Sequence, residues 1–166
     1  MKMRYLTVVA AVALLAACSD APKKAEEQSA TPTPPATMTP PMAKSDIVPG
    51  SQADFVKNVG DRLFFDYDKA SLKPEGKELL GKWVAFLNKY PNDQLLVEGH
   101  CDERGTREYN LALGERRANA VAEFLKANGV AATRLKTVSY GKERPAVLGS
   151  NEAAWAQNRR GVGVIQ

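Results

Sequence analysis

Residues 98–121 constrain the fold more than any other stretch, because a strand, a charged turn and a helix follow one another there. The apolar run 95–97 predicts a strand that ends at Gly99. Polar residues at 102–105 predict a turn that joins this strand to a helix. Apolar residues at helical spacing then predict that one face of the helix packs on a sheet: Leu113, Ala118, Val121, Phe124 and Leu125.

Arg117 interrupts this apolar stripe, four residues from both Leu113 and Val121. A buried guanidinium needs a partner, because a charge buried without one costs more free energy than a single contact returns. We expect the partner to be a carboxylate of the protein or of a ligand, and Asp102 is the nearest candidate along the chain. If the pocket is open to water, replacing Arg117 or Asp102 should change stability only modestly.

The rest of residues 55–166 predicts one α+β domain. Alternating apolar residues indicate a strand at 63–67, and further strands are expected at 94–100, 133–140 and 162–165. One helix should begin at 73–75 and end before Pro91, a second should span about Arg107–Ala127, and a short third is expected at 151–158. These elements predict helices packed on one face of a small mixed four-stranded sheet.

Residues 1–54 differ in composition from the predicted domain. Residues 1–17 have the layout of an export signal, with Lys2 and Arg4 before an apolar run that is too short to span a bilayer. Residues 18–54 contain seven of the ten prolines and almost no large apolar side chains. Such a segment cannot form a core, so we expect a disordered tether that spans ~35 Å as a flexible coil.

Several motifs resemble the OmpA-like peptidoglycan-binding family, and within it the peptidoglycan-associated (Pal) lipoproteins. They are Glu98-Gly-His-Cys-Asp-Glu-Arg-Gly-Thr106, Tyr109-Asn110, Leu113-Gly-Glu-Arg-Arg-Ala-Asn-Ala-Val121, Ser139-Tyr-Gly-Lys-Glu-Arg-Pro-Ala-Val-Leu-Gly149 and Glu152-Ala-Ala-Trp-Ala-Gln-Asn-Arg-Arg160. The resemblance runs from about Phe64 to the end of the sequence. It implies an OmpA-like sandwich.

The resemblance also implies a peptidoglycan-binding site. Asp102 and Arg117 would grip meso-diaminopimelate of the peptide stem, where the acid takes the ammonium and the guanidinium takes the carboxylate. Asn110 belongs to the same motif, and Asp68 with Tyr67 matches an acidic and an aromatic position beside the pocket. Arg104 and Thr106 lie in the turn and are candidate donors. For Arg159 and Arg160 we expect a structural role in closing the turn before the last strand.

Leu15-Ala-Ala-Cys18 resembles a lipobox, which implies that Cys18 carries a lipid after cleavage of residues 1–17. The alternative is an ordinary signal peptide with a chance cysteine. Ser19 after the cysteine implies sorting to the outer membrane, with the domain in the periplasm. The resemblance further implies peptidoglycan, TolB and TolA as partners in the Tol-Pal system, with a role in envelope integrity and cell division.

Other functional classes fit the sequence less well. The net charge of +4 falls to +2 without residues 1–17, which argues against nucleic-acid binding. His100, Cys101 and Asp102 suggest a metal or catalytic group, but the chain has one histidine, and Cys101 is expected to be a small buried side chain. We therefore expect no cofactor, no metal and no catalysis. Two alternatives stay open: a general OmpA-like wall anchor without Tol partners, and a cell-wall enzyme.

Overall fold

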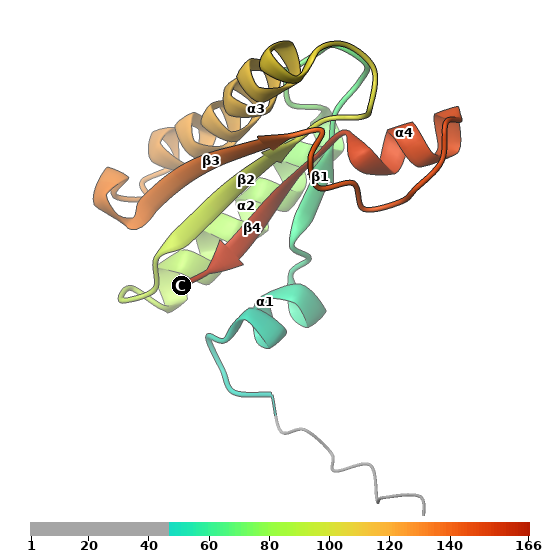
Figure 1. Ribbon diagram of the computed structural model, residues 1–166. Coiled ribbons are helices and arrows are strands. Elements are labelled where there is room, and N and C mark those ends of the chain that lie inside the picture. Colours follow the sequence, from blue (N-terminus) through green and yellow to red (C-terminus); the bar gives the residue numbers. More distant parts are fainter. Residues whose placement is uncertain (1–46) are drawn as a thin grey trace, which may run out of the picture. The chain divides into compact units, whose positions relative to one another are not determined.

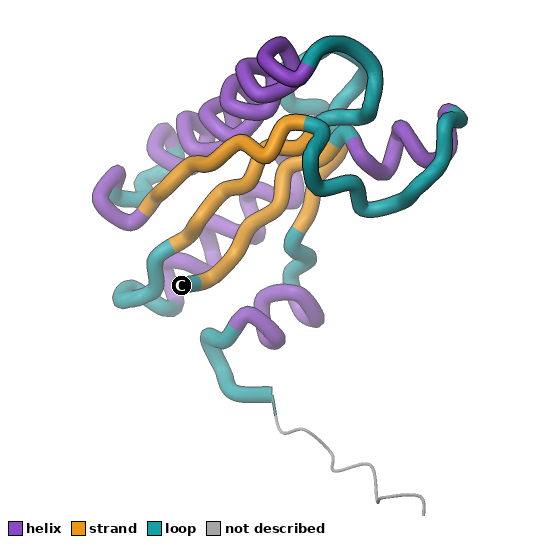
Figure 2. Tube along the Cα trace, in the orientation of Figure 1, coloured by secondary structure: helices purple, strands orange, loops and turns teal. Residues whose placement is uncertain are grey.

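The computed structural model describes residues 47–166, so the export signal, Cys18 and most of the predicted tether lie outside the described residues. The described part forms one open sheet with helices (Figures 1 and 2). None of its helices is both long and apolar enough to cross a membrane. In chain order the elements are α1 (Gln52–Asn58), β1 (Arg62–Phe64), α2 (Pro74–Lys89), β2 (Leu95–His100), α3 (Arg107–Ala127), a 3₁₀ turn (Ala132–Arg134), β3 (Leu135–Gly141), α4 (Glu152–Asn158) and β4 (Arg160–Ile165).

The strands form one mixed sheet in the order β1-β4-β2-β3. Strands β2 and β3 are parallel and are joined through α3, whereas β4 runs antiparallel to both β1 and β2. Helices α2 and α3 lie on the same face of this sheet (Figure 1). The predicted fold class, an α+β sandwich on a mixed four-stranded sheet, is therefore confirmed.

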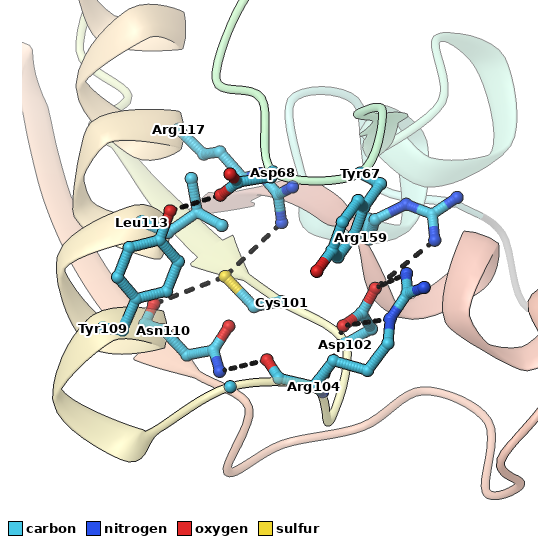
Figure 3. Close-up of a pocket in the computed structure, with 11 residues that line it drawn as sticks. Tyr67, Asp68, Cys101, Asp102, Arg104, Tyr109, Asn110, Leu113, Arg117 and Arg159 are labelled. Carbon is cyan, nitrogen blue, oxygen red and sulfur yellow. Dashed lines mark hydrogen bonds and ion pairs between the residues drawn. The ribbon is translucent and has the colours of Figure 1, made fainter.

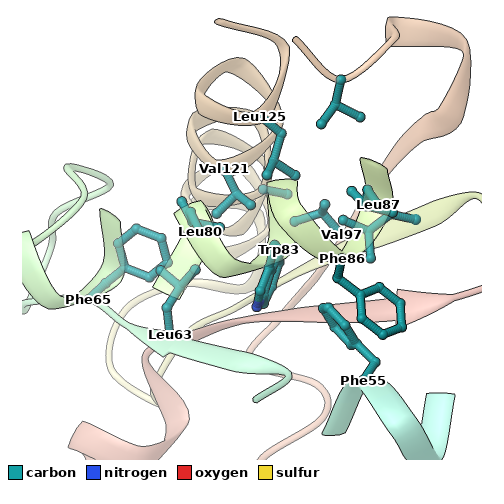
Figure 4. Close-up of a cluster of buried hydrophobic side chains, with 13 residues drawn as sticks. Phe55, Leu63, Phe65, Leu80, Trp83, Phe86, Leu87, Val97, Val121 and Leu125 are labelled. Carbon is teal, nitrogen blue, oxygen red and sulfur yellow. The ribbon is translucent and has the colours of Figure 1, made fainter. Parts of the chain in front are cut away.

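The buried core lies between these two helices and the sheet (Figure 4). Trp83 of α2 is fully buried, and its indole Nε1 donates to the carbonyl of Gly60 at 2.7 Å. The remaining core side chains come from the helices α1, α2 and α3, from β1 and β2, and from the loops after β1 and α3: Phe55, Leu63, Phe65, Leu80, Phe86, Leu87, Leu95, Val97, Ala118, Val121, Leu125 and Val130. Most of these are apolar positions that the helical and strand periodicities predict, and Phe55, Phe86 and Val130 are additions from the structure.

Helix α1 was not predicted, and it begins three residues before the expected start of the domain. Ser51 caps it, because its hydroxyl accepts from the amide of Asp54 at 3.2 Å. Phe55 then packs its ring 5.2 Å from Trp83 and 5.0 Å from Phe86. A single buried aromatic residue gives a short helix no detectable periodicity. The capping residue Ser51 was therefore the one feature of the sequence that could have indicated α1.

Strand β1 is shorter than the predicted strand at 63–67. Phe65 is still held to the neighbouring strand end, since its amide donates to the carbonyl of Arg159 at 2.9 Å. The chain then turns, and Asp68 adopts a left-handed conformation with φ of 55°, which aspartate tolerates better than most residues. As a result Tyr67 and Asp68 lie in a loop, outside the sheet.

Helix α3 approaches β2 closely at two glycines. A Cβ atom on Gly99 would lie 1.8 Å from the carbonyl oxygen of Gly114, and one on Gly114 would lie 2.3 Å from the hydroxyl oxygen of Ser139. Only residues without a side chain fit this contact. The close approach brings the start of α3 against the end of β2, which is where the candidate site lies.

Candidate functional site

A pocket of about 190 Å³ lies where the β1–α2 loop, the turn after β2, the start of α3 and the junction between α4 and β4 meet (Figure 3). Its lining comes from all four segments: Tyr67, Asp68, Cys101, Asp102, Arg104, Gly105, Tyr109, Asn110, Leu113, Arg117 and Arg159. Six of the seven predicted site residues are among them, and Thr106 is the exception. Residues up to 92 positions apart in sequence thus meet at one pocket.

Arg117 is completely buried. Its Nε donates to the carbonyl of Lys69 at 2.8 Å, and its Nη2 donates to the carbonyl of Asp66 at 3.0 Å. Its Nη1 donates to the carbonyl of His100 at 2.7 Å and contacts the sulfur of Cys101 at 3.4 Å. Burial lowers the pKa of this guanidinium from its ordinary value. Arg117 therefore joins the β1–α2 loop to the end of β2.

The expected ion pair between Arg117 and Asp102 is absent from the described residues. Asp102 instead binds two other arginines, because the turn folds back over it. Its Oδ1 accepts from the backbone amide of Arg104 at 3.1 Å and from the Arg104 Nε at 3.2 Å. Its Oδ2 accepts from Arg104 Nη2 at 2.6 Å and from Arg159 Nη1 at 3.3 Å.

These contacts keep the Asp102 carboxyl group ionised and occupy its hydrogen-bond acceptor positions. Burial raises the pKa of the Asp102 carboxyl, but the hydrogen bonds from Arg104 and Arg159 outweigh it and hold the pKa below its ordinary value. A carboxylate has about four lone-pair positions, and four donors already occupy them here. In this structure Asp102 has no acceptor position left for a ligand.

Asp68 has spare capacity, in contrast to Asp102. Its exposed carboxylate accepts from the hydroxyl of Tyr109, the first-turn residue of α3 that Figure 3 shows pointing toward it. This hydrogen bond raises the pKa of Tyr109. The ion pairs of the described residues include none with Asp68. Asp68 is therefore the pocket carboxylate that can accept further hydrogen bonds.

Asn110 and Thr106 shape the turn. The buried Asn110 side chain donates to the carbonyls of Arg104 at 2.8 Å and Thr106 at 3.0 Å. Thr106 is the N-cap of α3, and its hydroxyl accepts from the amide of Tyr109 at 3.2 Å. Thr106 thus orders the helix that carries the site and lies outside the pocket lining.

Arg159 is a pocket residue that sequence reasoning missed. Its Nε donates to the carbonyl of Phe65 at 3.1 Å, and its Nη2 binds Glu152 at 2.7 Å. The first contact agrees with the expected structural role. Arg159 also binds Asp102, which lies 57 positions away in the sequence. No local sequence pattern indicates such a pair.

Cys101, which lines the pocket, and its neighbour His100 are both buried, as expected for Cys101. The Cys101 thiol donates to the carbonyl of Asn110 at 3.3 Å, and burial raises its pKa. Burial also lowers the pKa of His100 to about 4, assisted by the positive charges of Arg160 and Arg144. Within residues 47–166, no group of three histidine, cysteine or acidic side chains is placed to hold a metal ion.

The pocket therefore presents one cation and one anion that lack partners of opposite charge within residues 47–166. Arg117 binds only neutral groups, namely carbonyls and a thiol. Within the described part of the chain, Asp68 binds only the phenol of Tyr109. A ligand that carries a carboxylate and an ammonium close together matches this pair, because each of its charges would find an uncompensated partner.

Comparison with known proteins places the chain in a family. Residues 64–159 match the family model described as OmpA family. The peptidoglycan-associated lipoprotein of Agrobacterium fabrum is 54% identical over 117 residues, which cover 70% of this chain and 66% of that protein. The peptidoglycan-associated lipoprotein of Pasteurella multocida is 40% identical over 159 residues, which cover 96% of this chain and 95% of that protein.

Solved structures agree with this assignment. The crystal structure of the peptidoglycan-associated lipoprotein from Burkholderia pseudomallei superposes with a TM-score of 0.63 at 44% sequence identity. The superposition covers 64% of this chain and 90% of that one. The family model spans more than half of the chain, and the sequence similarity extends across nearly all of it. The chain therefore belongs to the OmpA family.

Proposed function

We propose that this protein is a lipoprotein of the outer membrane that binds peptidoglycan noncovalently through meso-diaminopimelate. The observation that carries the proposal is Arg117, a fully buried guanidinium with no carboxylate among its hydrogen-bond partners, which lines the pocket. The names of the relatives add support, since they describe association with peptidoglycan. None of these names describes a reaction, which favours a binding role over a cell-wall enzyme.

Diaminopimelate fits the charges of the pocket. The free end of its side chain carries an ammonium and a carboxylate on the same carbon atom. We assign the carboxylate to Arg117, whose Nη2 keeps one N–H without an acceptor and whose charge has no carboxylate partner among the described residues. We assign the ammonium to Asp68 first, because the acceptor positions of Asp102 are occupied by Arg104 and Arg159. Asp102 then acts by holding these two arginines in place.

The partners TolB and TolA form a second part of the proposal. Support comes from the similarity to peptidoglycan-associated lipoproteins along nearly the whole chain and from the motif at 139–149. In this role the protein links the outer membrane to the cell wall during envelope maintenance and division. Co-purification with TolB from envelopes tests it. An absence of TolB would favour the alternative, a wall anchor without Tol partners.

A binding assay with purified sacculi tests the central claim. Residues 47–166 should sediment with sacculi, and free meso-diaminopimelate should release them. Sacculi whose free amino groups have been acetylated are the matched control, because acetylation removes the ammonium and keeps the glycan and the carboxylates. Equal binding to acetylated and untreated sacculi, or no competition by free diaminopimelate, would contradict the proposal.

A further inference from the structure

The guanidinium of Arg104 contacts two aromatic rings at the edge of the pocket. Its central carbon lies 4.0 Å from the ring centre of Tyr67 and 4.1 Å from that of Trp155. The rings come from different segments, the β1–α2 loop and α4. Cation–π contacts at this range are attractive, so both rings favour this position of the guanidinium. We call Tyr67 and Trp155 the aromatic clamp.

Trp155 is itself held in place. Its indole Nε1 donates to the carboxylate of Glu103 at 3.0 Å, which ties α4 to the turn after β2. Glu152, one turn earlier on α4, binds Arg159 at 2.7 Å and lies 3.9 Å from Arg104. The short helix therefore presents one aromatic ring and one carboxylate to the arginines that bind Asp102.

The clamp matters because Arg104 has a second carboxylate within the same pocket. The Arg104 side chain is 29% exposed, so the protein does not enclose it. An arginine side chain that is not held samples many rotamers. Asp68 lines the same pocket and has no cationic partner among the ion pairs of the described residues. A freed Arg104 would be drawn toward Asp68, where it would compete with a ligand ammonium.

We infer that Trp155, together with Tyr67, is a positioning residue that keeps Arg104 on Asp102 and so leaves Asp68 free for the ligand. This inference rests on the proposed function of the pocket. It explains how a pocket with three arginines keeps one carboxylate available. It also gives α4 a role in binding, although Trp155 is not part of the pocket lining.

The first test uses the full chain, purified in detergent, in the sacculus assay. Trp155→Leu removes the aromatic ring and should weaken binding about fivefold, the size expected for one cation–π contact. Trp155→Tyr keeps a ring and should bind within about twofold of the wild type. Both variants should show the same cooperative unfolding. Equal binding by wild type and Trp155→Leu would overturn the inference, whereas failure of the wild type to bind would overturn the proposed function.

The second test examines the clamp without a ligand. The chain contains two tryptophans, and Trp83 is fully buried in the core, so a change at the pocket affects the emission of Trp155. Arg104→Ala should alter the tryptophan emission of the wild type, and the same substitution should leave the emission of Trp155→Tyr unchanged. Identical emission with and without Arg104 would show that the guanidinium does not contact Trp155, and the inference would fall independently of any binding result.

Discussion

Arg117 and Asp102 line the same pocket, yet each binds other partners. The guanidinium of Arg117 donates to the carbonyls of Asp66, Lys69 and His100. The carboxylate of Asp102 accepts from Arg104 and Arg159. Arg117 is consequently both the uncompensated cation of the pocket and the residue that fixes the loop carrying Tyr67 and Asp68.

Replacing Arg117 with Leu should therefore cost substantial stability, contrary to the modest change expected from the sequence. Three carbonyl groups lose their donor, and a buried acceptor without a partner costs ~1–3 kcal/mol, reduced where water can enter. We expect a loss of about 3–5 kcal/mol in the free energy of unfolding, measured by urea denaturation. Sacculus binding should be lost as well.

Arg116 provides the matched control for this prediction. It is the neighbouring arginine on α3, and it is exposed. Arg116→Leu should change the free energy of unfolding by less than about 0.5 kcal/mol. If Arg117→Leu proved as mild as Arg116→Leu, the three carbonyl contacts would not be what holds the loop.

The burial of Arg117 could be predicted from the sequence, but its partners could not. Its place in the apolar stripe of α3 follows from helical spacing alone. Its hydrogen-bond acceptors Asp66 and Lys69 are backbone groups 51 and 48 residues away. Every residue has a carbonyl, so residue type says nothing about which one lies within reach. The nearest carboxylate along the chain was the wrong partner for this reason.

The sheet and its two long helices were predictable because each has a strong periodic signal. Helix α1 and the end of β1 were harder, because both depend on single contacts. Phe55 anchors α1 in the core, and the turn at Asp68 ends the strand early. Such contacts involve partners from distant segments, which a local pattern does not contain.

Gly114→Ala should destabilise the protein although alanine is the better helix former. The new Cβ would lie 2.3 Å from the Ser139 hydroxyl and 2.9 Å from the carbonyl of Gly99, and overpacking of this kind costs ~1–3 kcal/mol. Gly81→Ala on α2 is the control, since beyond the neighbouring backbone of its own helix no atom of the described residues lies within 4 Å of the added Cβ. That change should stabilise by ~0.5–1 kcal/mol. Thermal unfolding of the two variants should show opposite shifts.

Stability should fall as the pH decreases from neutral toward 4, with a contribution from His100. Its native pKa of about 4 lies below the ordinary value of 6.5, because of burial and the charges of Arg160 and Arg144. Glu98, 3.2 Å from its Nε2, accepts from the neutral ring. Between pH 6.5 and pH 4 the unfolded chain takes up a proton at His100, whereas the native protein does not. The free energy of unfolding therefore falls by up to about 3 kcal/mol over this range.

Urea denaturation at pH 7 and pH 4.5 measures this contribution. His100→Gln keeps a polar side chain of similar reach and does not titrate, so its loss of stability between the two pH values should be smaller than that of the wild type. An equal loss in both proteins would assign the pH dependence to other groups, such as the carboxyl of Asp102.

Cys18→Ala should release the protein from the outer membrane while leaving residues 47–166 folded. The expected lipid is the anchor, because residues 19–54 contain no strongly apolar stretch that could replace it. Fractionation of envelopes measures the release, and circular dichroism measures the fold. Mass spectrometry of the mature wild-type chain should find an acylated N-terminal Cys18, and any other N-terminus would contradict the lipobox interpretation.

Asp68→Asn and Asp102→Asn should both weaken binding to sacculi, but for different reasons. Asparagine at position 68 tolerates the left-handed backbone, and the substitution removes only an exposed charge. The free energy of unfolding should therefore change by less than about 0.5 kcal/mol. Asn at 102 leaves the buried Arg159 without its carboxylate in the pocket, so about 1–3 kcal/mol of stability should be lost.

Acetylated sacculi then separate the two roles. Wild type should bind untreated sacculi at least about tenfold more tightly than acetylated ones, as expected for one charge-assisted hydrogen bond. In Asp68→Asn this preference should disappear, because the group that recognises the ammonium is gone. In Asp102→Asn binding should be weaker overall while the preference remains, because Asp68 is intact. A preference that survives in Asp68→Asn and disappears in Asp102→Asn would instead place the ammonium on Asp102, which requires Arg104 to leave that carboxylate when the ligand binds.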